Sequence, residues 1–321
     1  MDRNTNGPPP NPPKKHHYIP AFYLARWATG ADKRLCQYSR PHKTVVANRR
    51  HPEATGFVER LYELEGLDGE LAQQVESKFF SPVDGAAADA LLLMETEGNR
   101  AVWDRRRRSA WSRFLHSVLV RAPEDVEIFK VGWRRLMLTD NNGEWEARYQ
   151  ELKGPNDPPT YKEFMLSFPD DDHNRSAMRA LAGMIDNENI GLKMNQMIWH
   201  IFDTPRGEYP LLTSDRPIIR TNGFHAQNGH LAMPIGPHKL FIAAKDQAAL
   251  RLMRSIAPGQ MVREVNRQIT DYAVKYVYGE DDRQLDFVQK HFATKKQPRL
   301  MASIADKYEE MADQLLPKKQ G

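Results

Sequence analysis

Cysteine is almost absent from this chain, since Cys36 is the only one among 321 residues. An intrachain disulfide is therefore impossible, and a zinc site built on paired Cys-x-x-Cys motifs is not expected. Long apolar runs are missing too: none approaches the roughly 18 residues that span a bilayer. The first residues also lack the apolar centre of a secretory signal. We therefore expect a cytoplasmic protein without a membrane partner.

Several nucleotide-binding and hydrolase signatures are also missing. The chain has neither a Walker A loop nor a Gly-x-Gly-x-x-Gly turn, so we expect no nucleotide cofactor. It has no His-Glu-x-x-His pair, and no Gly-x-Ser-x-Gly turn surrounds Ser214, which disfavours a serine-hydrolase triad. The net charge of +4 is small beside 46 basic and 42 acidic residues. This balance permits nucleic acid as a partner without requiring it.

The sequence divides into three parts. Residues 1–13 are a Pro-rich leader, which we expect to be disordered because it has little apolar surface to bury. Residues 14–294 are expected to form a single α+β domain, mainly helical with a small central antiparallel sheet. Residues 295–321 form a charged tail that we expect to be partly helical.

Hydrophobic periodicity indicates where helices and strands lie. Residues at helical spacing predict helices over 69–96 (interrupted at Pro82), 100–120, 123–139, 161–168, 175–194, 261–278 and 282–292. The polar stretch at 141–159 is expected to be a long surface loop. Short apolar or alternating runs predict strands at 35–38 and 44–47, and an antiparallel meander over 197–202, 209–212, 218–221, 231–234 and 240–243.

Two adjacent histidines, His16 and His17, lie where the leader gives way to the foldable segment at Tyr18. Imidazole is readily recruited as a ligand, acid or base near neutral pH. Neighbouring residues of an extended segment point to opposite sides, so one ring is expected to face a site and the other to pack or to bond the backbone. We assign the inward position to His17. A purely structural role for the pair is an equal alternative.

The element Thr213-Ser214-Asp215-Arg216-Pro217 is predicted to end a strand in a sharp turn. Ser214 and Asp215 either hold this turn through backbone groups or, at a strand exit, offer a carboxylate to a metal or substrate. In the second case Arg216 would bind an anionic group.

Glu76, Phe80 and Asp84 follow at intervals of four, which predicts a shared helix face unless Pro82 reorients it. The two carboxylates either join a histidine and Asp215 around a divalent ion or form a salt-bridged surface.

Basic residues concentrate on the helix predicted over 100–120. Arg105–Arg108 encircle it, because successive helical positions are about 100° apart. Arg106 and Arg113 are expected opposite its apolar side. They form either a solvated helix face or a surface that attracts phosphate groups. Arg121 ends the helix near that apolar side, so we expect it to be buried with an acidic partner, either Asp215 or Glu76.

Six sequence elements follow one another in a recognisable order: Lys-Lys-His-His-Tyr-Ile-Pro-Ala-Phe-Tyr-Leu from residue 14, Glu76 and Asp84 with Phe80 between them, Arg121-Ala122-Pro123, Thr213–Pro217, Pro234-Ile235-Gly236-Pro237, and Asn266 before Tyr276-Val277-Tyr278. In this order they resemble a mostly bacterial family called domain of unknown function 4238. The resemblance extends over about residues 14–280. Asp84 stands where a Glu is expected, and Ala122 where a hydroxyl residue is common. The resemblance implies an architecture and a shortlist of residues but no established chemistry.

Histidine, carboxylates and arginine together suit hydrolysis of a phosphodiester, with a metal-activated water and an arginine that stabilises the developing charge. The leading hypothesis is a metal-dependent, nuclease-like enzyme in a bacterial or phage conflict setting, with Mn, Mg or Zn as the metal and nucleic acid as partner. The alternative is a non-catalytic binding or regulatory protein whose motif residues are structural. The predicted site comprises the catalytic residues His17, Asp215 and Arg121, the substrate-binding residues Arg216, Asn266 and Tyr18, and the metal ligands His16 and Glu76.

Overall fold

The computed structural model describes residues 14–139, 143–206, 209–221, 228–296 and 301. The predicted leader and most of the predicted tail lie outside these residues. The described chain is mainly helical with small antiparallel sheets, which confirms the α+β class. None of its helices combines the length and the apolar character that crossing a bilayer requires.

Helices make up most of the described chain. The first half contains α1 (Ala21–Leu24), η1 (Ala25–Trp27), η2 (Pro52–Ala54), α2 (Gly69–Ala72), η3 (Glu76–Phe80), α3 (Ser81–Glu97), η4 (Gly98–Arg100), α4 (Arg105–Val120) and α5 (Pro123–Leu138). The second half contains α6 (Glu144–Leu152), α7 (Tyr161–Leu166), α8 (Asp170–Ile185), α9 (Glu188–Gln196), α10 (Gln247–Arg254), α11 (Pro258–Asp271) and α12 (Leu285–His291). Of the η elements, η3 is a turn of π-helix and the other three are 3₁₀ turns.

Local sequence explains several helix starts. Pro123 and Pro258 occupy the first turns of α5 and α11, where a missing N–H group costs nothing. Asp104, Asn187 and Asp246 precede α4, α9 and α10, and each side chain accepts a hydrogen bond from the first helical turn. The cap at Asn187 explains why the helix predicted over 175–194 is two helices, α8 and α9.

The described strands form three antiparallel sheets, where the sequence predicted one. A four-stranded sheet has the order β5-β9-β8-β7, with strands at Ile198–Asp203, Lys239–Ala244, His230–Gly236 and Ile219–Thr221. A second has the order β3-β2-β10-β6, with strands at Val46–Arg50, Leu35–Ser39, Val277–Gly279 and Thr213–Ser214. The third pairs β1 (Lys15–His17) with β4 (Phe57–Glu59).

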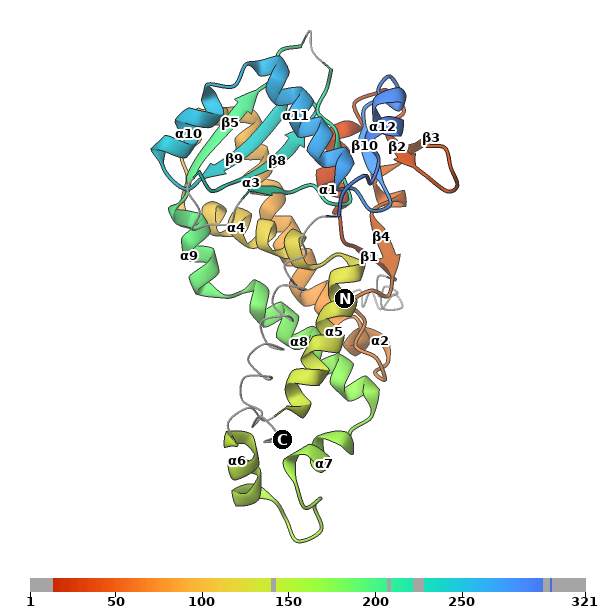
Figure 1. The fold of residues 1–321 in the computed structure, drawn as a ribbon, viewed down its shortest axis with the longest axis vertical. Helices are drawn as coiled ribbons and strands as arrows, with labels where there is room; N and C mark the ends of the chain where they lie inside the picture. Colours follow the sequence, from red (N-terminus) through yellow and green to blue (C-terminus); the bar gives the residue numbers. More distant parts are fainter. Residues whose placement is uncertain (1–13, 140–142, 207–208, 222–227, 297–300, 302–321) are drawn as a thin grey trace, which may run out of the picture.

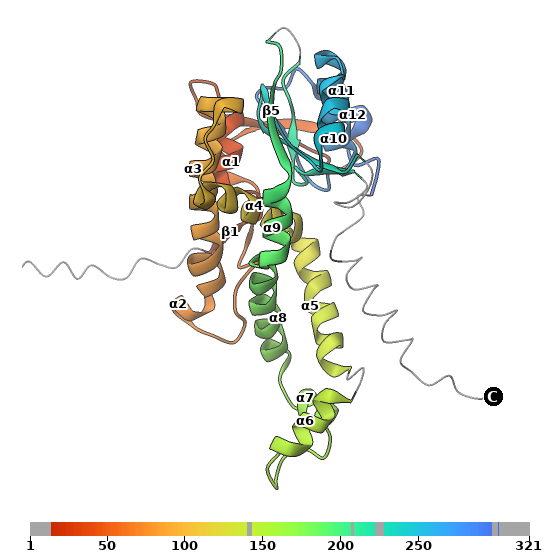
Figure 2. The same ribbon diagram turned by 90° about the vertical axis from the view of Figure 1, so that its left-hand side faces the viewer.

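The β5-β9-β8-β7 sheet is covered by helices on both faces. Side chains alternate along a strand, so Phe241 packs into one core with Trp111 of α4, whereas Ile242 packs into another with Val265 of α11. Figure 2 shows this layering, with α3 and α4 on one side of the sheet and α10 and α11 on the other.

The molecule is elongated (Figure 1). From the sheet end, α5 and α8 run side by side toward the opposite end, where α6 and α7 lie. A third core, which includes Tyr62, Phe80, Val126 and Leu181, fills the space between α5, α8 and the N-terminal segments.

Three predicted elements are wrong, two of them for identifiable reasons. The loop predicted at 141–159 contains α6, because Trp145 and Tyr149 contact aromatic side chains of α7. The helix predicted over 261–278 ends at Asp271, and residues 277–279 form β10 between β2 and β6. The run 209–212 is not a strand, although β6 follows it directly, and α10 was not predicted.

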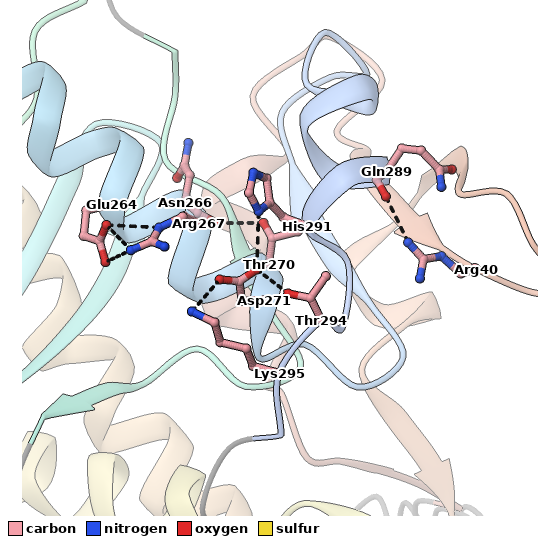
Figure 3. Close-up of polar contacts among 10 residues, drawn as sticks. All are labelled: Arg40, Glu264, Asn266, Arg267, Thr270, Asp271, Gln289, His291, Thr294 and Lys295. Atoms are coloured by element: carbon pink, nitrogen blue, oxygen red, sulfur yellow. Dashed lines mark hydrogen bonds and ion pairs between the residues drawn. The ribbon is translucent and has the colours of Figure 1, made fainter.

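The C-terminal end of α11 is tied to the segment after α12 (Figure 3). Asp271 accepts hydrogen bonds from the Thr294 hydroxyl at 2.5 Å and pairs with Lys295 at 3.1 Å. The Arg40 guanidinium donates to the Gln289 carbonyl at 3.0 Å. These bonds join the segment after α12 to α11, and the residue after β2 to α12.

Candidate functional site

Strand β1 directs its two histidines to opposite sides, as the strand period predicts. His16 is fully buried and His17 half-buried. Pairing of β1 with β4 fixes this orientation, because His16 lies opposite Val58 and His17 opposite Phe57.

His16 has both ring nitrogens in hydrogen bonds. Its Nδ1 accepts from the Tyr62 backbone N–H at 2.8 Å, and its Nε2 lies 2.6 Å from the Gln73 side-chain oxygen. The ring also stacks on Tyr62. A metal ion needs a free nitrogen lone pair, and this arrangement leaves none. The structure thus gives His16 a structural position rather than that of the predicted metal ligand.

The inward position was assigned to His17, but the fully buried ring is that of His16, and His17 is the more exposed of the two. Burial lowers its pKa even though its ring bonds the Glu53 backbone, and the Arg121 charge lowers the pKa further. Its Nε2 atom is buried and has no hydrogen-bond partner. At neutral pH this ring is therefore uncharged, with one polar atom available to a ligand.

Arg121 follows α4 and is fully buried, as predicted, but its acidic partner is Asp84. Its Nη1 donates to Asp84 at 2.8 Å and its Nε donates to the Tyr18 carbonyl at 3.1 Å. The guanidinium lies over the rings of Phe80 and Phe114. Its Nη2 is buried without a partner.

Glu76 opens the π-helical turn η3 and is 8 % exposed. Burial raises the pKa of its carboxyl group to about 7; the Arg121 charge opposes this rise and the Asp84 charge adds to it. Its Oε2 atom is buried without a hydrogen-bond partner. A single π-helical turn within helical chain is frequent at functional sites.

His17, Glu76, Asp84 and Arg121 form what we call the Glu76 cluster. The Arg121 charge acts on the pKa of each of the other three, so the four groups lie within electrostatic range of one another. Three of them carry a buried polar atom without a partner. Such atoms are rare in folded proteins because each costs free energy unless a ligand or water satisfies it. The cluster reaches solvent through half-buried His17 and through Asp84, whose side chain is 18 % exposed.

Asp215 does not join this cluster. Its two carboxylate oxygens accept hydrogen bonds from the backbone N–H groups of residues 274, 275 and 276, at 2.8, 2.5 and 3.1 Å. Burial raises the pKa of this carboxyl group, although the three N–H groups oppose the rise. The Ser214 hydroxyl accepts from the Arg216 backbone at 3.1 Å. The turn-holding alternative for this element therefore fits the structure.

The three predicted substrate-binding residues are also engaged within the protein. Arg216 pairs with Glu124 at 2.8 Å and Asp125 at 3.1 Å. Asn266 accepts from the Leu212 N–H and donates to the Pro210 carbonyl. Tyr18 is 3 % exposed, and its carbonyl group holds Arg121.

The predicted metal ligands are not assembled around one point. Among the described residues, no three His, Cys, Asp or Glu side chains are grouped as a metal ion requires. Of the predicted ligands, Glu76 alone has an oxygen without a partner, since the nitrogens of His16 are bonded.

Sequence reasoning underrated Asp84 and did not identify Tyr62 or Gln73. Asp84 was visible in the spacing from Glu76, but its pairing with Arg121 joins α3 to the end of α4. Tyr62 and Gln73 hold His16 across 46 and 57 residues. No local pattern reports contacts over such separations.

Comparisons with known proteins identify a family. No curated protein and no solved structure matches this chain. A family model described as "Protein of unknown function (DUF4238)" matches residues 15–283. This range includes the Glu76 cluster, the turn at Asp215 and nearly all of the described fold, so the chain belongs to the DUF4238 family.

Proposed function

We propose that the protein is a phosphodiester hydrolase of the nuclease type, in which the Glu76 cluster carries the chemistry. The supporting observation is the Glu76 carboxyl group, whose pKa of about 7 accompanies an unpartnered oxygen beside a buried guanidinium. Perturbed carboxyl groups of this kind concentrate at active sites. The proposal moves the reaction centre from Asp215, the residue favoured by sequence, to Glu76.

Glu76 is the proposed general base. With a pKa of about 7 it is present in both protonation states at neutral pH, which is the condition for efficient proton transfer. A water molecule gives its proton to Glu76 as the water oxygen bonds to phosphorus. The bond from phosphorus to the leaving oxygen then breaks, and that oxygen takes up a proton from bulk water, while Glu76 returns its own proton to bulk water.

Arg121 is the proposed electrostatic group. Its Nη2 has N–H groups to donate, while Asp84 and the Tyr18 carbonyl fix the rest of the guanidinium. A donor held in place before the reaction stabilises the charge that develops on phosphate oxygens, because no reorganisation is needed. The free Nε2 of His17 supplies an acceptor that orients the attacking water.

Nucleic acid in the cytoplasm is the proposed substrate. A divalent metal would supply additional positive charge for the phosphate, and of the predicted ligands Glu76 has the oxygen left to hold it. The exposed Lys15, which lies within electrostatic range of His17, favours an anionic substrate at this side of the molecule.

Cleavage of labelled single-stranded DNA, double-stranded DNA and RNA tests the proposal, with Mg, Mn or Zn added and with chelator. We expect Glu76→Gln to lower cleavage by about 10²- to 10⁴-fold, the usual contribution of a general base. Glu70→Gln is the matched control, because Glu70 is an exposed acid on the neighbouring helix α2. Wild-type protein that cleaves none of these substrates, or Glu76→Gln that cleaves at the wild-type rate, would refute it.

A non-catalytic binding or regulatory role is the second candidate. It is favoured by the engagement of His16, Asp215, Arg216 and Asn266 in hydrogen bonds and ion pairs within the fold. Under this alternative Glu76→Gln changes stability alone, and the wild-type protein has no hydrolytic activity with any of the metals.

A further inference from the structure

A cavity of about 550 Å³ lies between α4, the end of α8 and α9. It is separate from the Glu76 cluster, as none of that cluster's residues lines it. Figures 1 and 2 show α9 beside α4, near the start of β5. This volume falls within the range of small-molecule sites, about 300–1,000 Å³.

One face of α4 forms a wall of the cavity. The lining residues of this helix are Arg105, Arg108, Ser109, Ser112, Arg113 and His116. Their intervals of three and four place them on a single helical stripe. From Arg105 to His116 the stripe extends roughly 16 Å, at 1.5 Å per residue.

The end of the cavity nearest the start of α4 is suited to an anion. Arg105 is exposed and has no ion-pair or hydrogen-bond partner in the described part of the chain. Ser109, one turn further on, accepts from Asn195 at 3.3 Å, so its own O–H group remains to donate. Arg108 lies over the Trp199 ring and donates to two backbone carbonyls, which fixes its guanidinium. The amino-terminal end of a helix adds favourable potential for negative charge.

The far end of the cavity offers a hydrogen-bond acceptor. His116 is 3 % exposed, and its Nδ1 donates to the Ile185 carbonyl at 3.2 Å. Burial lowers its pKa. The ring is then neutral with Nε2 as an acceptor, and this atom has no hydrogen-bond partner among the described residues. Because His116 lines the cavity, its Nε2 is the acceptor that this end offers to an N–H or O–H group of a ligand.

Of the three arginines that line the cavity, Arg108 and Arg113 already bind groups of the protein, so Arg105 is the one available to a ligand. Arg113 is already bonded by both oxygens of Asp186. The cavity therefore combines a cation and a hydroxyl donor at one end with a neutral acceptor at the other. Apolar contact is available from Ile185 and Leu192.

We propose that this cavity binds a small phosphate ester, whose phosphate contacts Arg105 and Ser109 and whose N–H or O–H group donates to His116. This site is independent of the proposed hydrolase activity. A bound ester would contact α4, α8 and α9 together.

Calorimetric titration of the full chain tests the site. The probes are adenosine 5′-monophosphate and ribose 5-phosphate, compared with adenosine, ribose and inorganic phosphate. We expect saturable binding of at least one ester, with the uncharged compounds and inorganic phosphate at least about tenfold weaker. That ratio corresponds to about 1.4 kcal/mol.

Matched variants assign the binding to the cavity. Arg105→Ala should weaken the ester about tenfold or more, whereas Arg106→Ala should leave it unchanged, because Arg106 is an exposed neighbour that does not line the cavity. His116→Phe, verified as folded by circular dichroism, should weaken the ester but not inorganic phosphate. Equal losses in the two arginine variants, inorganic phosphate as strong as the esters, or no binding at millimolar concentration would each overturn the assignment.

Discussion

Replacement of Glu76 by Gln is expected to stabilise the protein at neutral pH while it removes the proposed activity. The folded-state pKa of about 7 lies above the ordinary value of 4.5, so the folded protein holds a proton that the unfolded chain releases. Stability therefore falls as pH rises from about 4.5 to about 7 and is constant beyond. Gln is uncharged at every pH and similar in shape, so it avoids this loss.

The magnitude follows from the two pKa values. At about 1.4 kcal/mol per pH unit, the difference between them lowers the free energy of unfolding by about 3.4 kcal/mol once Glu76 is fully ionised in both the folded and the unfolded state. Partial ionisation reduces the penalty to about 3 kcal/mol near pH 7 and to about 0.8 kcal/mol near pH 5. Because Glu76 is only 8 % exposed, solvent screening reduces this ionisation penalty little. The loss of the bond with Ser81 reduces the gain further.

Urea unfolding at a series of pH values measures this effect. The gain in unfolding free energy of Glu76→Gln over the wild type should increase between pH 5 and 7 and then remain level. Glu70→Gln should show no such increase, since Glu70 is exposed. A difference between Glu76→Gln and wild type that is independent of pH would refute the reasoning, because it would place the carboxyl pKa at its ordinary value.

Three further substitutions have distinct expected outcomes. Asp84→Asn leaves the buried Arg121 charge without its partner, which should lower the free energy of unfolding in urea by about 3–5 kcal/mol. The same substitution should lower the pKa of Glu76, because the Asp84 charge raises that pKa. The pH range over which stability falls should therefore shift to lower pH. Asp215→Ala leaves three backbone N–H groups without an acceptor and should lower the melting temperature far more than Arg216→Lys, which preserves a charge for Glu124. Asn266→Ala removes the acceptor for the Leu212 N–H and the donor to Pro210, at an expected cost of about 2 kcal/mol or more in the same assay.

Features that depend on local periodicity could be predicted from the sequence. The opposite orientations of His16 and His17 follow from the two-residue period of a strand, and the burial of Arg121 follows from its place beside the apolar side of α4. Helix α5 lies within one residue of its predicted bounds for the same reason, and α4 ends at the predicted residue although it begins at Arg105.

Features that depend on long-range contacts could not be predicted. The π-helical turn at Glu76–Phe80 departs from the regular helical spacing that the sequence suggested, so the 76, 80, 84 interval did not identify which carboxylate pairs with Arg121. The pKa of Glu76 depends on burial produced by tertiary packing. The residues at 276–278 match a helical period, yet β10 forms there because β2 and β6 lie on either side of it.

The position of β10 between β2 and β6 also bears on the order in which the protein can fold during synthesis. Strand β2 is complete once residue 39 has been made, but its partner β10 emerges from the ribosome only after residue 279. Until then β2 has β3 on one edge and an open edge on the other, which invites pairing with another chain. Protein synthesis adds about 5–20 residues per second, so this edge stays open for roughly 12 to 50 seconds. The nascent chain therefore has a defined interval of vulnerability, and chains that terminate before β10 should aggregate or be held by chaperones.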